Sequence, residues 1–144
     1  MPSELRIYIA APWKFKAYAA QIASKIESQG DLRFVVQSRW HDLTVDDDNT
    51  ALWEHEAHND ISDVFDCDVM LVLNLEKSEG KAFEQGMAYT LGKPIIVWGE
   101  PTNVFHALHH KFKFTYDWDS TWDLLTRLAD VRVSPMTLPV RVMA

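Results

Sequence analysis

Hydrophobic residues along the chain follow two alternating patterns. Short runs of consecutive apolar residues predict buried strands, and segments with apolar residues three or four positions apart predict amphipathic helices. The expected strands lie at residues 5–11, 34–36, 68–75, 95–98 and 112–116. The expected helices lie within residues 14–29, 50–66, 78–94, 103–110 and 119–129. Because strands that alternate with helices favour parallel pairing, the sequence predicts an α/β fold: a three-layer, doubly wound, five-stranded parallel sheet of flavodoxin-like order 2-1-3-4-5.

The helix expected at residues 50–66 has an apolar side and an acidic side. We expect its hydrophobic residues to face the core: Leu52, Trp53, Ala57, Ile61, Val64 and Phe65. Glu56, Asp60 and Asp63 fall at positions i, i+4 and i+7, so they lie roughly along one face of the helix.

A carboxylate, Glu84, lies in the first turns of the helix expected within residues 78–94. The loop before this helix should lie at the carboxyl edge of the sheet, the edge at which parallel strands end and open α/β sheets bind ligands. Gly92 followed by Pro94 ends the helix. We interpret the segment as one that presents Glu84 to a ligand. Interaction with the helix dipole is the alternative explanation of an acidic residue at this place.

Length, hydropathy and charge narrow the class of protein. A chain of 144 residues, 47% of them hydrophobic, fits a single domain over residues 1–144, with a tail at 131–144 that packs on the domain or on a neighbouring subunit. The sequence has neither a membrane-spanning apolar stretch nor a secretion signal, so we expect a cytoplasmic protein without a membrane partner. A net charge of −7 argues against a nucleic acid polymer as partner, but not against a small nucleotide in one pocket.

The residues with metal-binding side chains have no convincing metal-site spacing. An HExxH motif starting at His55 needs a second histidine at position 59, which is Asn59. We interpret His106, His109 and His110 as surface histidines of a short helix, and residues 46–48, three aspartates, as a solvated turn. The loop that contains Gly80 is neither a Walker loop nor a GxGxxG motif. We therefore expect no metal and no cofactor.

Short motifs spread over residues 5–128 together resemble the nucleoside 2-deoxyribosyltransferase family, including the related nucleoside 5′-monophosphate N-glycosidases. They are, in chain order, Ile7-Tyr8-Ile9-Ala10, Ser38-Arg39-Trp40, Asn59-Asp60, Glu84-Gln85-Gly86-Met87-Ala88 with Gly92-Lys93-Pro94 after it, and Asn103-Val104-Phe105. The resemblance implies an enzyme that cleaves or exchanges the N-glycosidic bond of deoxynucleosides or their 5′-monophosphates. Since a fold alone does not fix function, a nucleotide-binding module without chemistry is the alternative.

The resemblance implies three catalytic residues. Glu84 matches the family nucleophile, which attacks C1′ of the sugar and forms a deoxyribosyl ester that a second base or water then opens, as in retaining glycosidases. Asp60 matches the aspartate that contacts the base and helps to protonate the leaving group. Tyr8 matches a tyrosine whose hydroxyl orients the nucleophile, and a core tyrosine on the first strand is the alternative.

Three further residues are expected to bind the nucleoside. Trp13 and Trp40 follow the first two strands and form either an aromatic wall against the base or part of the core. Asn103 matches a residue that, in the family, the adjacent subunit supplies to the 5′ side of the sugar. The resemblance therefore implies a homo-oligomer, a dimer or larger, in which Asn103 acts in trans.

Ser78 departs from the transferase pattern. It stands six residues before Glu84, where the transferases usually have an aspartate, and it is similar to the serine of the branch that hydrolyses nucleoside 5′-monophosphates. The Ser78 hydroxyl and the backbone amides near Gly80 can hold a phosphate, which Lys77 and Lys81 would neutralise. A solvated loop with two surface lysines is the alternative. Ser78 favours hydrolysis of a nucleotide, whereas Asn103 favours a nucleoside.

Overall fold

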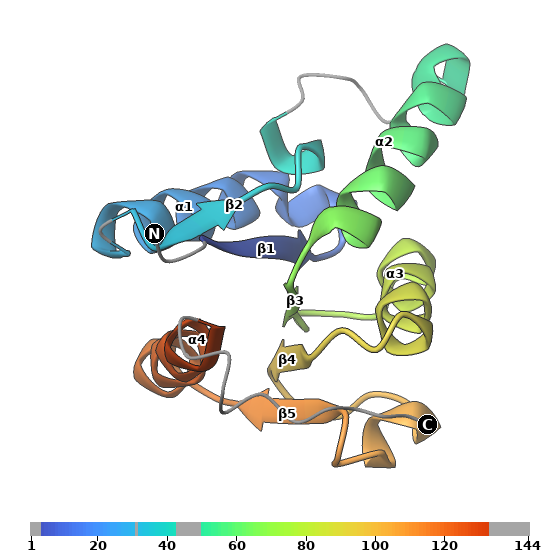
Figure 1. Cartoon of the computed structure of the whole chain (residues 1–144). Helices are drawn as coiled ribbons and strands as arrows, with labels where there is room; N and C mark the ends of the chain where they lie inside the picture. The colour runs from blue at the N-terminus through green and yellow to red at the C-terminus, as the bar shows by residue number, and fades with distance from the viewer. Residues whose placement is uncertain (1–3, 31, 43–49, 133–144) are drawn as a thin grey trace.

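Five parallel strands form one sheet in the computed structural model, which describes residues 4–30, 32–42 and 50–132 (Figure 1). The strands are β1 (Leu5–Ala10), β2 (Phe34–Val36), β3 (Val69–Leu73), β4 (Ile95–Trp98) and β5 (Phe112–Thr115). Their order in the sheet is β2-β1-β3-β4-β5, and all neighbours are parallel. The predicted fold class and strand order are confirmed.

Within the described residues, four α-helices cover the two faces of the sheet, and four short 3₁₀ turns lie in the connections. The α-helices are α1 (Lys16–Gln29), α2 (Trp53–Asp66), α3 (Glu79–Thr90) and α4 (Trp118–Arg132). The 3₁₀ turns are η1 (Trp13–Phe15), η2 (Trp40–Asp42), η3 (Thr50–Leu52) and η4 (Val104–Ala107). Helices α2 and α3 lie on one side of the sheet and α1 and α4 on the other (Figure 1). The helix predicted at 103–110 is only the short turn η4.

The core lies around the central strands β1, β3 and β4. Every residue of β3 is buried, which explains its uninterrupted apolar sequence, because a strand covered by helices on both faces exposes neither side to water. Tyr8 in β1 pairs in register with Met70 in β3, and both are fully buried. Gly92 has a φ of 75°, the left-handed conformation that the sequence predicts for the residue after α3.

The predicted orientation of α2 is largely wrong. Of the six hydrophobic residues expected to face the core, only Val64 is buried. Trp53 is 57% exposed and Phe65 is 56% exposed. The helix contacts the sheet through a narrow strip, and its broad apolar side faces outward, where it has no partner within the described part of the chain.

Two sequence predictions concern segments outside the described residues. They are the acidic turn at 46–48 and most of the tail at 131–144. Among the described residues, no helix is both long and apolar enough to cross a membrane.

Candidate active site

Tyr8 and Glu84 form a direct hydrogen bond between β1 and α3. The Tyr8 hydroxyl donates to Glu84 Oε2 over 2.5 Å. Tyr8 points from the buried middle of β1 toward the α2–α3 side, and Glu84 lies in the second turn of α3. Burial, followed by the nearby Glu84 carboxylate, raises the pKa of the Tyr8 hydroxyl well above its ordinary value. Tyr8 therefore stays protonated and remains a hydrogen-bond donor to Glu84.

Burial is the main cause of the shifted pKa of Glu84. It raises the pKa of the carboxyl to about 8, although the hydrogen bond from Tyr8 acts in the opposite direction, and the nearby Asp60 raises it further. The helix dipole acts mainly within the first turn, and Glu84 lies beyond it. The alternative in which Glu84 only complements the dipole therefore does not describe this residue.

Asp63 of α2 is paired with Arg39, which follows β2. Arg39 donates to the Asp63 carboxylate from its backbone N at 3.1 Å, from Nε at 3.1 Å and from Nη2 at 2.9 Å. The Asp63 side chain is only 7% exposed, so this pair compensates a nearly buried charge. The arrangement gives Asp63 a structural role beside Asp60.

Asp60 lies one turn before Asp63 and has no such donor. Its Oδ1 atom is buried and accepts no hydrogen bond from the described residues. Burial is the first cause that raises its pKa, to about 7, followed by the negative charges of Asp63 and Glu56, whereas Arg39 lowers it. Asp60 and Glu84 interact electrostatically, so the structure brings the two predicted catalytic acids and Tyr8 together.

The two tryptophans predicted to contact the base differ in their surroundings. Trp40 is 5% exposed and donates its indole N–H to the Ile9 carbonyl over 2.6 Å, so it is part of the core. Trp13 is half-buried and packs against Trp40 with a centroid distance of 6.0 Å. Trp13 is thus the tryptophan whose ring retains accessible surface, with the Lys16 ammonium 5.1 Å from its centroid.

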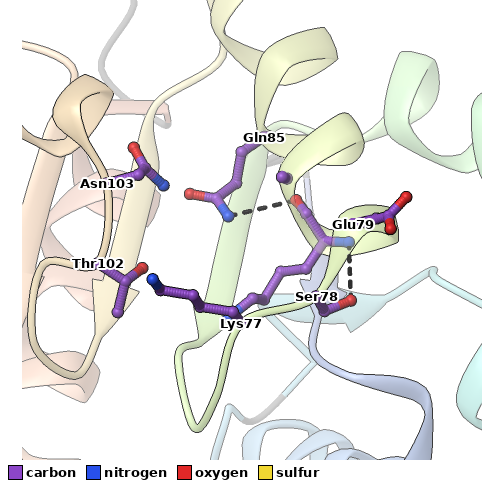
Figure 2. A pocket seen from close by; sticks show the side chains of 8 residues that line it. Lys77, Ser78, Glu79, Gln85, Thr102 and Asn103 are labelled. Carbon is purple, nitrogen blue, oxygen red and sulfur yellow. Dashed lines mark hydrogen bonds between the residues drawn. The ribbon is translucent and has the colours of Figure 1, made fainter.

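Ser78 caps the N-terminus of α3 at the mouth of a cavity of about 370 Å³ (Figure 2). Its Oγ accepts the backbone N–H of Lys81 over 3.3 Å. A methyl group at Gly80 would meet only the Ser78 hydroxyl, at 4.0 Å, so the first turn of α3 is open to a ligand. Lys77 and Asn103 are exposed and line the same cavity.

Lys81 is buried instead of lying on the loop surface. Its ammonium is only slightly exposed and donates to Asn74 Oδ1 and to the Glu76 carbonyl, the latter over 2.5 Å. Burial is the first cause that lowers the pKa of Lys81. This placement does not favour the predicted contact between Lys81 and substrate, because the ammonium is held beneath the loop that carries Ser78.

A second set of buried polar groups links α3 to η4. His106 is 1% exposed, so its interpretation as a surface residue is wrong, whereas His109 and His110 are exposed. His106 Nδ1 accepts the Thr102 N–H over 3.0 Å, which leaves Nε2 to donate to Gln85 Oε1 over 2.9 Å. Gln85 in turn donates to the Lys81 carbonyl (Figure 2). These bonds fix the helix that carries Glu84 against the loop that carries Asn103.

Asn103 lies across the cavity from α3 and caps η4. Its Oδ1 accepts the N–H groups of Phe105 and His106, over 2.9 and 3.3 Å. The side chain amide of Asn103 thus keeps its N–H groups for another partner. Its side chain is exposed, as a residue supplied to a neighbouring subunit has to be.

Several residues of this site had no role in the sequence interpretation. Arg39 was noted only as part of a motif, and Asn74, Gln85 and Thr102 had no assigned contact. The sequence signal for these residues is a polar side chain in or beside an apolar segment. That signal does not identify their hydrogen-bond partners, which lie up to 28 residues away in the chain. In the part of the chain that the structure describes, no group of three or more His, Cys, Asp or Glu side chains is placed to hold a metal ion.

The fold and the site define a doubly wound α/β protein with a pair of buried acids and a tyrosine on the α2–α3 side of its sheet. Two solved structures are similar to it. The CMP N-glycosidase BcmB of Clostridium botulinum is 17% identical, with a TM-score of 0.55, over 85% of this chain and 98% of that one. A 2-deoxyribosyltransferase of Bacillus psychrosaccharolyticus is 22% identical, with a TM-score of 0.52, over 81% of this chain and 89% of that one.

The sequence itself shows the family. No curated protein sequence matches the chain. The family model of nucleoside 2-deoxyribosyltransferase matches residues 7–138. The chain therefore belongs to the nucleoside 2-deoxyribosyltransferase family, whose members are enzymes that act on nucleosides or nucleotides, and the resemblance found in its motifs is confirmed.

Proposed function

We propose that the protein cleaves or exchanges the N-glycosidic bond of deoxynucleosides or their 5′-monophosphates, with Glu84 as nucleophile. The hydrogen bond from Tyr8 to Glu84 Oε2 carries this proposal. It fixes one oxygen of the carboxylate and leaves the other to approach C1′ of the sugar. Membership of the family and the nearby buried Asp60 support the same assignment.

The proposed reaction has two steps. The ionised Glu84 carboxylate bonds to C1′ while the bond from C1′ to the base nitrogen breaks, and the electron pair of that bond passes to the base. Asp60 supplies the proton that makes the departing base neutral. A water or a second base then bonds to C1′, gives a proton to the ionised Asp60, and releases Glu84 as a carboxylate. Water gives hydrolysis, and a base gives transfer.

The raised pKa values keep a proton on this pair near neutral pH, although their order favours the proton on Glu84. With values of about 7 and about 8, Asp60 and Glu84 hold a proton with similar affinity. Near neutral pH the pair therefore holds about one proton, and the reactive arrangement has it on Asp60 with Glu84 ionised. Tyr8 favours this arrangement, because its hydrogen bond stabilises the Glu84 carboxylate.

The 5′-monophosphate branch is the second candidate, and the α3 N-terminus favours it. The Ser78 hydroxyl, the open first turn at Gly80 and the exposed Lys77 lie at one cavity, and together they suit a dianionic phosphate. Lys81 would act beneath this site by holding the loop through Glu76. A nucleotide-binding module without chemistry is the remaining alternative.

We also propose that the active unit is a homo-oligomer. Phe65 of α2 and Phe83 of α3 are 56% and 63% exposed, and they line a shallow apolar cavity of about 530 Å³ together with Met87 and Leu91. An apolar surface of this kind on a small protein indicates an interface. A second copy of the chain is the occupant proposed here, and it would bring Asn103 to the neighbouring site.

A panel of substrates tests these assignments. Purified protein is given deoxynucleosides, ribonucleosides and their 5′-monophosphates, each with and without a second base, and released base is measured by chromatography. Release without an added base indicates a hydrolase, and exchange of bases indicates a transferase. Saturable binding without release would instead support the binding module.

The matched variants are Glu84→Gln and Glu79→Gln, both in α3. Glu84→Gln is expected to fold and to lose base release by at least roughly 10³-fold, since the nucleophile is removed. Glu79 is exposed in the first turn, so Glu79→Gln is expected to keep full activity. Unaltered turnover of Glu84→Gln would contradict the proposed function.

A further inference from the structure

Helix α2 carries two buried carboxyl oxygens without a hydrogen-bond donor. They are Oε2 of Glu56 and Oδ1 of Asp60. Residues four apart in a helix lie one above the other on the same face, so the two side chains are neighbours. Two ionised carboxylates in this position would repel each other, and neither would receive a hydrogen bond from the described residues. A proton on one of them provides the missing donor for both.

The other charged groups around Asp60 do not supply that donor. Asp63 on the same helix accepts the backbone N–H and the guanidinium of Arg39. Arg39 lowers the pKa of Asp60 only as the last of the four causes. Tyr8 of β1 donates to Glu84 of α3, and Glu84 is itself an acid. Among the described residues, a proton between the carboxyl groups of Glu56 and Asp60 is therefore the hydrogen-bond donor that remains for them.

We infer that Glu56 is a positioning residue that keeps Asp60 protonated by sharing one proton between the two buried carboxyl oxygens. The use of that proton rests on the proposed function, in which Asp60 passes it to the departing base. Glu56 itself touches neither the sugar nor the nucleophile in this scheme. It determines the pH range in which Asp60 can act as an acid.

The direction of the Asp60 pKa agrees with this role. Its rise to about 7 has burial as first cause, and the charges of Asp63 and Glu56 follow. Because Arg39 is paired directly with Asp63, Glu56 is the neighbouring carboxylate without an ion pair among the described residues. Removing its charge is expected to lower the pKa of Asp60 and to leave that of Glu84, whose causes do not include Glu56, much less affected.

The pH profile of kcat/KM tests the inference. In Glu56→Gln the pKa of Asp60 is expected to fall by roughly one unit, because one like charge is lost. The value of kcat/KM should then fall by about tenfold at pH 8 and remain unchanged at pH 5, where Asp60 is protonated in both proteins. The control is Glu54→Gln, whose side chain is 91% exposed on the other side of α2, and its profile should match the wild type. An unchanged kcat/KM at pH 8, or an equal loss at every pH, would overturn the inference.

A second measurement does not depend on turnover. The carboxyl carbon of Asp60 can be titrated by ¹³C NMR in the wild type and in Glu56→Gln, with Asp60→Asn to assign the signal. We expect a lower midpoint in Glu56→Gln and no change in Glu54→Gln. An equal midpoint in wild type and Glu56→Gln would reject the shared proton even if base release is observed. A lowered midpoint in a protein without turnover would support the shared proton while the proposed function fails.

Discussion

Two acids, Glu84 and Asp60, have pKa values above their ordinary range, and burial is the first cause for both. Reaction requires an ionised Glu84 and a protonated Asp60, so activity should fall on both sides of an optimum. With values of about 8 and about 7, the optimum lies between these pH values, and the limbs describe the pair and not either residue alone. The hydrogen bond from Tyr8 lowers the pKa of Glu84, and the charge of Glu56 raises the pKa of Asp60.

Replacing Tyr8 by phenylalanine tests the donor to the nucleophile. The hydrogen bond from Tyr8 lowers the pKa of Glu84, so its loss should raise that pKa further. With the pKa of Glu84 roughly one unit higher, kcat/KM is expected to fall by about tenfold at pH 6 and far less at pH 9, where Glu84 ionises more readily. A pH–rate profile measures this. An unchanged kcat/KM at pH 6 in Tyr8→Phe would show that the hydroxyl does not tune Glu84.

The same burial predicts a stability effect of Glu84. A carboxyl with a raised pKa in the folded state contributes stability at low pH and loses it as pH rises from its ordinary value near 4.5 to about 8. Glu84→Gln should therefore be more stable than the wild type at pH 8, by about 4 kcal/mol, and the difference should vanish near pH 4.5. Urea unfolding at the two pH values measures it. Equal stability at pH 8 would show that the carboxylate is well solvated.

At the level of secondary-structure elements, α3 performs two tasks at two places along its length. Its N-terminus opens on the cavity through Ser78, and its second turn presents Glu84 to Tyr8. The side chains of Lys81 and Gln85, four residues apart, bind the helix to the neighbouring loops. Movement of this helix would therefore displace the nucleophile and the cavity together.

Removing the Ser78 hydroxyl separates its structural role from a substrate role. Ser78→Ala loses a helix cap, which costs about 1 kcal/mol of stability. If Ser78 also holds a 5′-phosphate, KM for monophosphates should rise by roughly tenfold while KM for nucleosides is unchanged. Ser28→Ala, at the far end of α1, is the control. Equal changes in KM for nucleosides and monophosphates would show that Ser78 only caps helix α3 and does not bind the phosphate.

The sequence was informative about strands and about local signals in the helices. Apolar runs predict the central strands, because β3 is covered on both faces, and Gly92 marks the end of α3 by its left-handed backbone. Helix α2 was misjudged because periodicity shows that a helix has an apolar side but not which partner covers it. Its exposed Trp53 and Phe65 follow the helical pattern as well as the buried Val64 does.

The sequence predicts only those residues of the site that belong to family motifs. The motifs identify Tyr8, Asp60 and Glu84 as site residues, and the structure brings these three side chains together. The sequence does not show that Lys81 is buried or that His106 is fixed by Gln85, because both contacts depend on how α3 packs against two loops. Polar groups that meet only through tertiary packing have no local sequence signal.

For the whole molecule, we expect residues 1–144 to form one domain that acts as an oligomer. Helices α2 and α3, which carry these exposed apolar residues and Glu84, lie on the same side of the sheet (Figure 1). A partner on this side would cover Phe65 and Phe83 and lie close to the site. Assembly and activity are therefore expected to be lost together.

Charge placed in the apolar surface tests this coupling. Phe83→Asp is expected to convert the oligomer to a monomer and to reduce activity by at least roughly tenfold, since a buried unpaired charge is costly. Light scattering gives the mass in solution.

Mixed oligomers of Asn103→Ala and Glu84→Gln chains should regain part of the activity that each lacks alone, if Asn103 acts in trans. A monomeric wild type with full activity would contradict the proposed assembly.

The ester on Glu84 is the central claim, and trapping it is the most direct test. A 2′-deoxy-2′-fluoro nucleoside destabilises the oxocarbenium-like transition state and should slow both steps, so the ester accumulates. After acid quench and proteolysis, mass spectrometry should find the fluorinated sugar on the peptide that contains Glu84, in proportion to the base released in the first turnover. Release of base with an unmodified Glu84 peptide would contradict the account.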